Sequence, residues 1–182
     1  MITIYCQDQL PSREILAREE EQRKAELSAA VGEIIAAVRA RGDQALRDYA
    51  KTFDHVEVEA LEVTAQELDK AVEDLDPAFR QVLEEAAENI RDFHSRQVRQ
   101  SFVVSQKEGV VLGQKVIPIQ KVGLYIPGGT AAYPSSVLMN AIPAKIAGCP
   151  QVVMVSPPSQ GGDIAPVILA VARIAGEDRV FR

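Results

Sequence analysis

One stretch of the sequence combines residue types that α/β proteins use to hold phosphates and dinucleotides. The segment KVGLYIPGGTAAYPSSVLMN, residues 121–140, runs from an apolar, strand-like stretch through Pro127-Gly128-Gly129 into a predicted helix start. Glycines let the backbone approach a ligand closely, and a helix N-terminus offers unpaired N–H groups to an anion. Tyr125, at the end of the strand, offers a ring face or a hydroxyl. Ligands of α/β sheets bind at this position, beyond the carboxyl end of a strand.

The same residues also fit an ordinary turn, so both interpretations stay open on spacing alone. The segment contains neither the G-x-G-x-x-G fingerprint nor a P-loop, and Pro-Gly-Gly is a common turn sequence. Ser135 and Ser136 are predicted to cap the helix rather than act as nucleophiles, because no G-x-S-x-G elbow surrounds them. Pro143 falls inside the predicted helix and is expected to kink or break it.

Other nucleophiles and metal ligands are few and widely spaced. The two cysteines, Cys6 and Cys149, and the two histidines, His55 and His94, do not share the spacing of a metal site. Cys149 follows a helix-ending glycine, so a small buried thiol is predicted, and His94 is predicted to be structural. A disulfide between the cysteines is not expected in a reducing compartment.

The bulk composition is that of an acidic globular protein. The chain has 182 residues, 47% hydrophobic residues and a net charge of −6, which allows one large domain or two small ones. No apolar run predicts a membrane span, and the N-terminus lacks the order of a secretory signal, so a cytoplasmic protein is expected. No basic stripe predicts nucleic-acid binding, because the densest basic stretch, RDFHSRQVRQ, is typical of a solvated helix end.

The N-terminal part of the chain is predicted to be helical. A helix is expected from Ser12 to Gly42, and Asp43 is expected to cap the next one. Apolar residues at helical spacing predict one buried stripe on the first helix, formed by Leu27, Val31, Ile34, Ile35 and Val38. The second helix is predicted to bury Leu46, Tyr49 and Phe53.

Two further helices carry start signals. The alternating segment VEVEALEV predicts a half-exposed strand or link, and Thr64 and Glu67 after it have capping-box spacing. Asp76-Pro77 predicts a second start, with proline at the first helical position. The helix after Pro77 is predicted to place on one face Phe79, Val82, Leu83, Ala86, Ile90 and Phe93.

The C-terminal part alternates strands and helices. Residues 102–126 are β-rich, and Pro118 makes the middle piece an edge strand or a bend. The following elements are predicted to be a strand at 121–126, a helix at about 135–147, a strand at QVVMVS, a helix at 163–175 and the first residues of a third strand at RVF. This alternation implies parallel pairing. The predicted fold class is α/β, a helical N-terminal region followed by an incomplete Rossmann-like parallel α/β layer.

Three segments of the chain resemble a known family. VGLYIPGGTAAYPSSVLMNAIPAKIAGCPQVVMVSPP resembles the signature region of the histidinol dehydrogenases. VRARGDQALRDYAKTFD and AAENIRDFHSRQ are similar to earlier helical regions of the same family. The resemblance extends in register from about residue 12 to the end of the chain.

The resemblance implies a function and a set of partners. It implies zinc-dependent, four-electron oxidation of L-histidinol to L-histidine with two NAD, the last step of histidine biosynthesis, in an intertwined homodimer. It also implies that Tyr125 contacts NAD, and the positions of Gly128 and Gly129 suggest the same for them. The implied domains are an N-terminal arm at 1–21, the first part of the main domain at 22–120 and the start of the Rossmann-like cofactor domain at 121–182.

The chain departs from the family in length. Histidinol dehydrogenases are more than twice as long, and their zinc ligands, general-base Glu-His pair and most substrate contacts have no match here. No catalytic residue and no metal ligand is therefore assigned to this chain, which is expected to be inactive alone. Two alternatives remain: a non-catalytic nucleotide-binding or dimerising module, and an aldehyde-type NAD-linked oxidoreductase with Cys149 as nucleophile.

Overall fold

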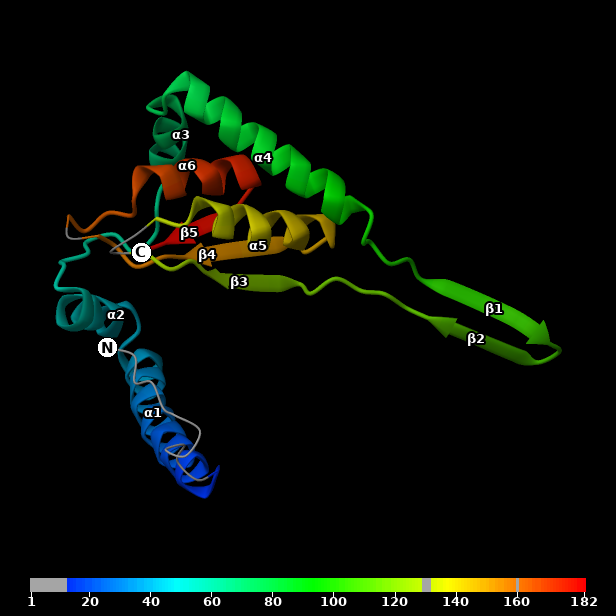
Figure 1. The fold of residues 1–182 in the computed structure, drawn as a ribbon, viewed down its shortest axis with the longest axis horizontal. Coiled ribbons are helices and arrows are strands. Elements are labelled where there is room, and N and C mark those ends of the chain that lie inside the picture. Colours follow the sequence, from blue (N-terminus) through cyan, green and yellow to red (C-terminus); the bar gives the residue numbers. More distant parts are fainter. Residues whose placement is uncertain (1–12, 129–131, 160) are drawn as a thin grey trace, which may run out of the picture. The chain divides into compact units, whose positions relative to one another are not determined.

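The computed structural model describes residues 13–128, 132–159 and 161–182, with side chains in the first helix from Arg23 onward. The chain divides after Asp48 into two compact units, Met1–Asp48 and Tyr49–Arg182. Figure 1 shows the elements of both. The domain boundaries predicted after residues 21 and 120 stay predictions.

The first unit contains the long helix α1, Arg13–Arg41, and most of α2, Asp43–Tyr49. The predicted end of α1 is confirmed, since Gly42 has a left-handed φ of 57° and its N–H donates to the Val38 carbonyl at 2.8 Å. Within the described residues, no helix is both long enough and apolar enough to cross a membrane.

The predicted burial of the α1 stripe is wrong for this chain. Leu27, Val31 and Ile35 are 58%, 51% and 45% exposed. Their spacing places them on one face, but a face is buried only where another element covers it. The same correction applies to Leu46 and Phe53, which are also exposed.

The second unit begins with the short π-helix η2, Ala50–Asp54. An extended link, residues 55–64, follows it. Along the link Val56 and Val58 are buried whereas Glu57 and Glu59 are exposed, as the alternation predicted. The link continues along β5 (Arg179–Phe181), where the Val63 N–H donates to the Val180 carbonyl at 2.9 Å. It therefore covers one edge of the sheet.

Both predicted helix starts are confirmed. Helix α3, Ala65–Glu73, begins with a complete capping box, in which Thr64 accepts from the Glu67 N–H and the Glu67 carboxylate accepts from the Thr64 N–H at 2.7 Å. Helix α4, Pro77–Ser95, begins at Asp76, whose carboxylate accepts from the Phe79 N–H at 3.0 Å.

Only part of the predicted α4 face is buried. Leu83 and Ala87 are in the core, and Ala86 and Ile90 pack against it. Three other apolar side chains of the predicted face are exposed: Phe79, Val82 and Phe93. Helix α4 packs against α5 and α6, and these cover only the middle of its length.

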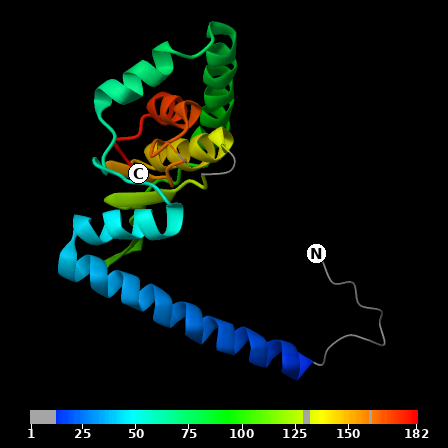
Figure 2. The same ribbon diagram turned by 90° about the vertical axis from the view of Figure 1, so that its left-hand side faces the viewer.

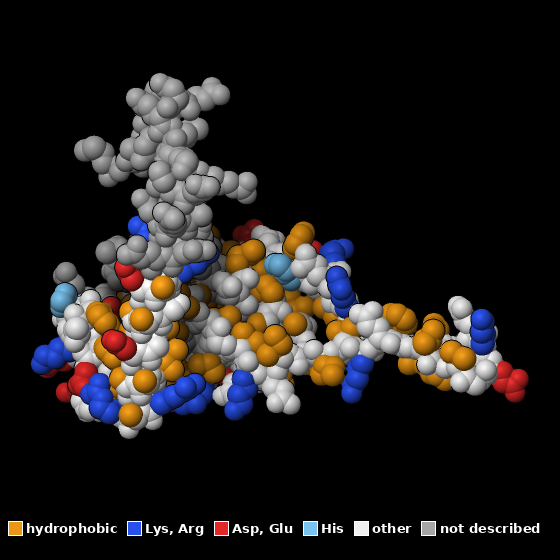
Figure 3. Space-filling view, turned by 90° about the horizontal axis from the view of Figure 1, so that it is seen from below, with side chains coloured by type: hydrophobic (Ala, Val, Ile, Leu, Met, Phe, Trp, Pro, Cys, Tyr) orange, Lys and Arg blue, Asp and Glu red, His pale blue; other side chains and the backbone are white. Residues whose placement is uncertain are grey.

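The strands β1, Phe102–Lys107, and β2, Val110–Gln114, pair as an antiparallel hairpin. Every residue of both strands is exposed, and Figure 3 shows hydrophobic side chains along the hairpin. Pro118 lies in the segment after β2 and in no strand. The strand β2 itself pairs only with β1, so the middle of the β-rich region contains an edge strand, one of the two predicted alternatives.

The remaining strands form the predicted parallel sheet. They are β3, Lys121–Tyr125, β4, Gln151–Val155, and β5, in the order β3-β4-β5. Helices α5, Pro134–Ile146, and α6, Pro166–Ala175, connect them and lie on one face, with α3 and α4 outside them (Figures 1 and 2). The predicted α/β fold class is confirmed.

The predicted caps of α5 and a break at Pro143 are wrong, whereas a kink at Pro143 stays a prediction. Ser135 and Ser136 do not cap the helix, because Pro134 takes the first helical position and makes Tyr133 the N-cap residue, which has no side-chain cap bond. Pro143 does not break the helix, which runs through it to Ile146. Proline has no N–H to donate to the carbonyl four residues earlier, which belongs to Met139, an exposed residue.

Glu177 is an unusual core residue. It is 6% exposed, and neither carboxylate oxygen has a hydrogen-bond partner among the described residues. Helix α6 ends at Gly176 with a φ of 83°, and the Glu177 N–H donates to the Ala172 carbonyl at 3.0 Å. A hydrophobic side chain usually occupies this position after such a helix end. Burial raises the pKa of Glu177 from 4.5 to about 7, against the opposing charge of Lys145 and with a smaller contribution from Asp178.

Replacing this carboxylate is predicted to stabilise the chain in a pH-dependent way. Because the raised pKa means that the folded chain holds the proton more tightly, ionisation of Glu177 destabilises the fold as pH rises from about 4.5 to about 7. Glu177→Gln is expected to raise the free energy of unfolding by about 1–3 kcal/mol near pH 8 and by little near pH 4.5. Urea unfolding at both pH values measures this. The exposed Glu85→Gln is the control, and an equal gain for Glu177→Gln at both pH values would contradict the explanation.

Candidate functional site

The loops that follow β3 and β4 meet at the carboxyl edge of the sheet. Ile126 is fully buried and its N–H donates to the Val155 carbonyl at 2.9 Å. Ser156 is also buried and its N–H donates to the Phe181 carbonyl at 3.1 Å. Each loop thus continues the strand ladder by one residue before it leaves the sheet.

Gly128 lies close to the loop after β4. A Cβ atom at this position would be 2.9 Å from the Pro157 carbonyl oxygen and 2.9 Å from the Ser156 hydroxyl oxygen. Such contacts are too short for any side chain, so the path of the loop requires glycine here. Gly129, the second predicted glycine, lies outside the described residues.

Tyr125 lies on the open face of the sheet, opposite α5 and α6. Its side chain is 66% exposed. Its neighbour across the sheet is Val155, whose own neighbour on β5 is Phe181. The three side chains form an aromatic–aliphatic–aromatic row along the carboxyl edge, a surface on which a planar ring of a ligand can stack.

The charge nearest to this row is already paired. The guanidinium of Arg179 lies 4.8 Å from the centre of the Phe181 ring and donates to both carboxylate oxygens of Glu62 at 2.7 Å. The hydrogen bond from Arg179 lowers the pKa of Glu62, and the same bond raises the pKa of Arg179. The carboxylate of Glu62 therefore offsets the positive charge of Arg179 at this edge.

The loop after β4 is tied to the link by the side chain of Arg182. This side chain is buried, donates to the carbonyls of Ala60 and Glu62 at 3.3 Å, and forms ion pairs with Glu67 and Asp163. The pKa of Glu67 is lowered, first by the backbone bond from Thr64 and then by bonds from the Thr64 side chain and from Arg182. These contacts hold the loop after β4, which forms one side of the candidate site.

The other candidate residues lie elsewhere. Cys149 is buried and precedes β4, at the amino edge of the sheet, so it does not meet the glycine loop. That placement argues against Cys149 as the nucleophile of an aldehyde-type site. His94 and Cys149 both line a separate cavity, and His55 ends η2 in a left-handed conformation. Among the described residues, no three His, Cys, Asp or Glu side chains gather as a metal site would require.

Comparison with known proteins identifies the family. The family model described as histidinol dehydrogenase matches residues 17–182. The chain belongs to the histidinol dehydrogenase family. This confirms the resemblance seen in the sequence.

Individual histidinol dehydrogenases agree with this assignment. The enzyme of Geobacillus kaustophilus is 46% identical over 170 residues, and that of Bacillus subtilis is 45% identical over 170 residues. Each comparison covers 93% of this chain but only 39% of the relative. The crystal structure of histidinol dehydrogenase from Elizabethkingia anophelis superposes with a TM-score of 0.80 at 33% identity, over 86% of this chain and 36% of that one. The chain thus spans about two-fifths of the length of the curated histidinol dehydrogenases that it matches.

Part of this site could not be found from the sequence. Tyr125 was predicted from its place at the end of a strand and from the family resemblance, and Gly128 from its position in the loop; their role stays a prediction. Ser156 was missed, since a serine after a strand carries no local signal. Only the pairing of β3 with β4 brings its hydroxyl against Gly128.

The close approach at Gly128 predicts a specific sensitivity to substitution. Gly128→Ala is expected to lower the free energy of unfolding by about 1–3 kcal/mol, because the added methyl group forces the two loops apart. Gly123→Ala is the matched control on β3, where nothing lies within 4 Å of an added Cβ, and its effect is expected to stay within about 0.5 kcal/mol. Denaturant unfolding compares the two, and equal effects would refute the steric argument.

Proposed function

We propose that this chain is the N-terminal portion of a histidinol dehydrogenase that oxidises L-histidinol to L-histidine in histidine biosynthesis. The observation that carries the proposal is the family match over residues 17–182. The carboxyl-edge geometry supports it, because an exposed aromatic row lies beside a loop whose glycine is required by close packing. As a biosynthetic enzyme of this kind, the protein is assigned to the cytoplasm.

The proposed role of the carboxyl edge is to hold part of NAD, which when bound accepts the hydride removed from the substrate. Tyr125 would contact the cofactor through its exposed ring, with Val155 and Phe181 extending the apolar surface. Gly128 and Gly129 would let the loop backbone come close to the cofactor. Since Arg179 is paired with Glu62, backbone N–H groups rather than this guanidinium would meet the pyrophosphate.

Zinc and substrate contacts are not assigned to this chain. The family implies zinc, but the described His, Cys, Asp and Glu side chains do not assemble a ligand set for it. We assign zinc binding, proton abstraction and recognition of L-histidinol to the part of the family that lies outside the 182 residues. The chain by itself is therefore proposed to be inactive.

A homodimer formed through α1 is proposed as well. The exposed residues Leu27, Val31 and Ile35 recur every fourth position, so they form an apolar stripe on one side of the helix. A stripe of this kind is typical of a helix that packs against another polypeptide. The same observation favours the alternative function, a non-catalytic nucleotide-binding or dimerising module.

A fusion distinguishes the dehydrogenase from the non-catalytic module. The chain alone, given L-histidinol, NAD and zinc, is expected to form no NADH above background. A fusion of residues 1–182 to the C-terminal portion of the Geobacillus kaustophilus enzyme, joined in register, is expected to form NADH under the same conditions. A folded but inactive fusion would favour the non-catalytic module, and turnover by the chain alone would overturn the proposed division of labour.

In the same fusion, Tyr125→Ala is expected to weaken NAD binding. Loss of an aromatic stacking contact of about 0.5–1.5 kcal/mol predicts a KM for NAD about twofold to tenfold higher, with a smaller change in kcat. Phe79→Ala, an exposed aromatic on α4, is the control. Steady-state kinetics with varied NAD measures both, and an unchanged KM for Tyr125→Ala would remove this residue from the cofactor site.

A charge in the α1 stripe is expected to break the dimer. Val31→Asp should convert the sedimenting species from dimer to monomer, because an aspartate cannot be buried there without a partner. Ala29→Asp adds the same charge on the opposite side of α1 and should leave the dimer intact. Analytical ultracentrifugation measures the mass and circular dichroism checks that helix content is kept. A monomeric parent chain, or equal effects of the two variants, would contradict the dimer.

A further inference from the structure

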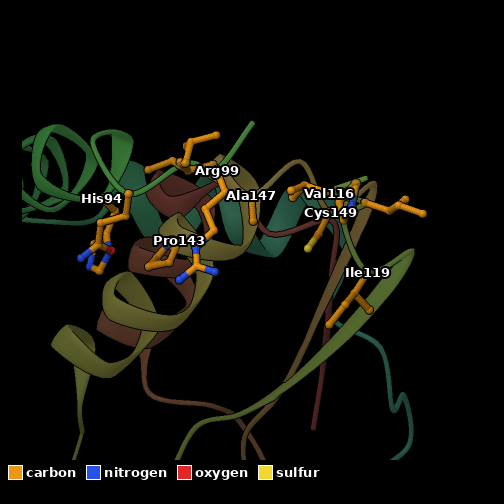
Figure 4. Close-up of a pocket in the computed structure, with 12 residues that line it drawn as sticks. His94, Arg99, Val116, Ile119, Pro143, Ala147 and Cys149 are labelled. Atoms are coloured by element: carbon orange, nitrogen blue, oxygen red, sulfur yellow. The ribbon is translucent and has the colours of Figure 1, made fainter. Parts of the chain in front are cut away.

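A cavity lies at the amino edge of the sheet, at the opposite end of α5 from the candidate NAD site. Its volume is about 380 Å³, within the range of small-molecule sites. Three segments far apart in the sequence form its walls (Figure 4): the end of α4 with the residues after it, the segment between β2 and β3, and the end of α5 with the turn after it. No part of the proposed NAD edge contributes to it.

Specific contacts bring together the segments that form the walls of the cavity. The Ser101 hydroxyl accepts from the Val116 N–H at 2.8 Å and lies 3.4 Å from the Val116 carbonyl oxygen, which joins the two segments that lead into and out of the hairpin. Gly148 ends the turn after α5 with a φ of 83°, and Pro118 lies 3.7 Å from where its Cβ would be. The return segment therefore lies against the turn at the end of α5.

Most of the lining is apolar. Ile117 and Ile119 line the cavity and are still 67% and 68% exposed, and Pro143 and Ile146 of α5 lie on the opposite wall. A ligand with an apolar body would remove this surface from water.

The ionisable nitrogen groups at the cavity are the Arg99 guanidinium and the His94 imidazole. No acidic side chain of the described residues lines it. Figure 4 shows both side chains on the side of Pro143. The Nδ1 atom of His94 lies 2.7 Å from Oε1 of Gln97, which orients the ring. Arg99 has no hydrogen bond or ion pair within the described part of the chain. Arg96, which lies nearby in the sequence, is paired with Asp92.

We propose that this cavity binds a monocarboxylic acid with an apolar chain or ring. Arg99 receives the carboxylate, since a guanidinium fork matches the two carboxylate oxygens, and His94 adds a second polar contact at the same side. The apolar body lies between Ile119 and Ile146. The site goes beyond the proposed dehydrogenase function, because the whole length of α5 separates it from the NAD edge.

The first test titrates octanoate into the 182-residue chain and measures its binding by isothermal titration calorimetry. Saturable binding is expected for octanoate and not for octylamine, and 1-octanol is expected to bind about tenfold more weakly. Arg99→Gln is expected to weaken octanoate binding about tenfold, the effect of losing a charged hydrogen bond. Arg96→Gln is the matched control, since Arg96 does not line the cavity. Equal affinity for octanoate and 1-octanol, equal effects of the two arginine variants, or no saturable binding would each overturn the proposal.

A second variant and a chemical readout locate the ligand. Ile119→Asp places a negative charge in an exposed part of the wall, so it should abolish octanoate binding while far-UV circular dichroism stays unchanged. In a Cys6→Ser chain, octanoate is expected to slow the reaction of Cys149 with a maleimide several-fold, because Cys149 lines the same cavity. Octanoate binding that survives Ile119→Asp, or leaves the Cys149 rate unchanged, would place the ligand elsewhere. Failure to bind octanoate while a hydrophobic peptide protects Cys149 would assign the cavity to a polypeptide instead.

Discussion

Val152 and Met154 on β4 and Val180 on β5 expose no surface, because they point from the sheet into the layer formed by α5 and α6. Alternate residues of a strand face opposite sides, so this burial fixes the register of the parallel pairs and directs Tyr125 and Val155 to the other face. A shift of β3 by one residue would bury Tyr125 and expose Leu124. The position of the candidate cofactor row therefore follows from the packing of the core behind it.

The same one-sided packing explains why the sheet needs the link. A short parallel sheet with helices on a single face has little to hold its outer strand. Here Val63 pairs with Val180, Arg182 donates its backbone N–H to Leu61, and Glu62 binds the guanidinium of Arg179. These bonds protect the free edge of β5. They also pair the Arg179 guanidinium beside the aromatic row with a carboxylate.

Local signals in the sequence predicted local structure well. The Thr64–Glu67 capping box and the Asp76-Pro77 start need only a few neighbouring residues, and both are confirmed. The α1 stripe was predicted correctly as one helical face and wrongly as buried, because burial depends on what covers the face. Ser135 and Ser136 were assigned as caps, but Pro134 moves the helix start one residue earlier. The cavity around Arg99 had no sequence signal, since its walls come together only when the hairpin segments return to α5.

Helix α5 connects the two candidate sites, and a glycine contributes to the site at each end. At the carboxyl edge, Gly128 allows one loop to reach the Ser156 hydroxyl. At the amino edge, Gly148 adopts a left-handed conformation that turns the chain beneath Pro118. At Gly128 the absence of a side chain lets two loops lie close together, whereas at Gly148 glycine is favoured by the left-handed backbone conformation. The helix between them is buried against the core along Val137, Leu138, Ala141 and Ile142, so close packing holds the two ends of α5 at a fixed separation.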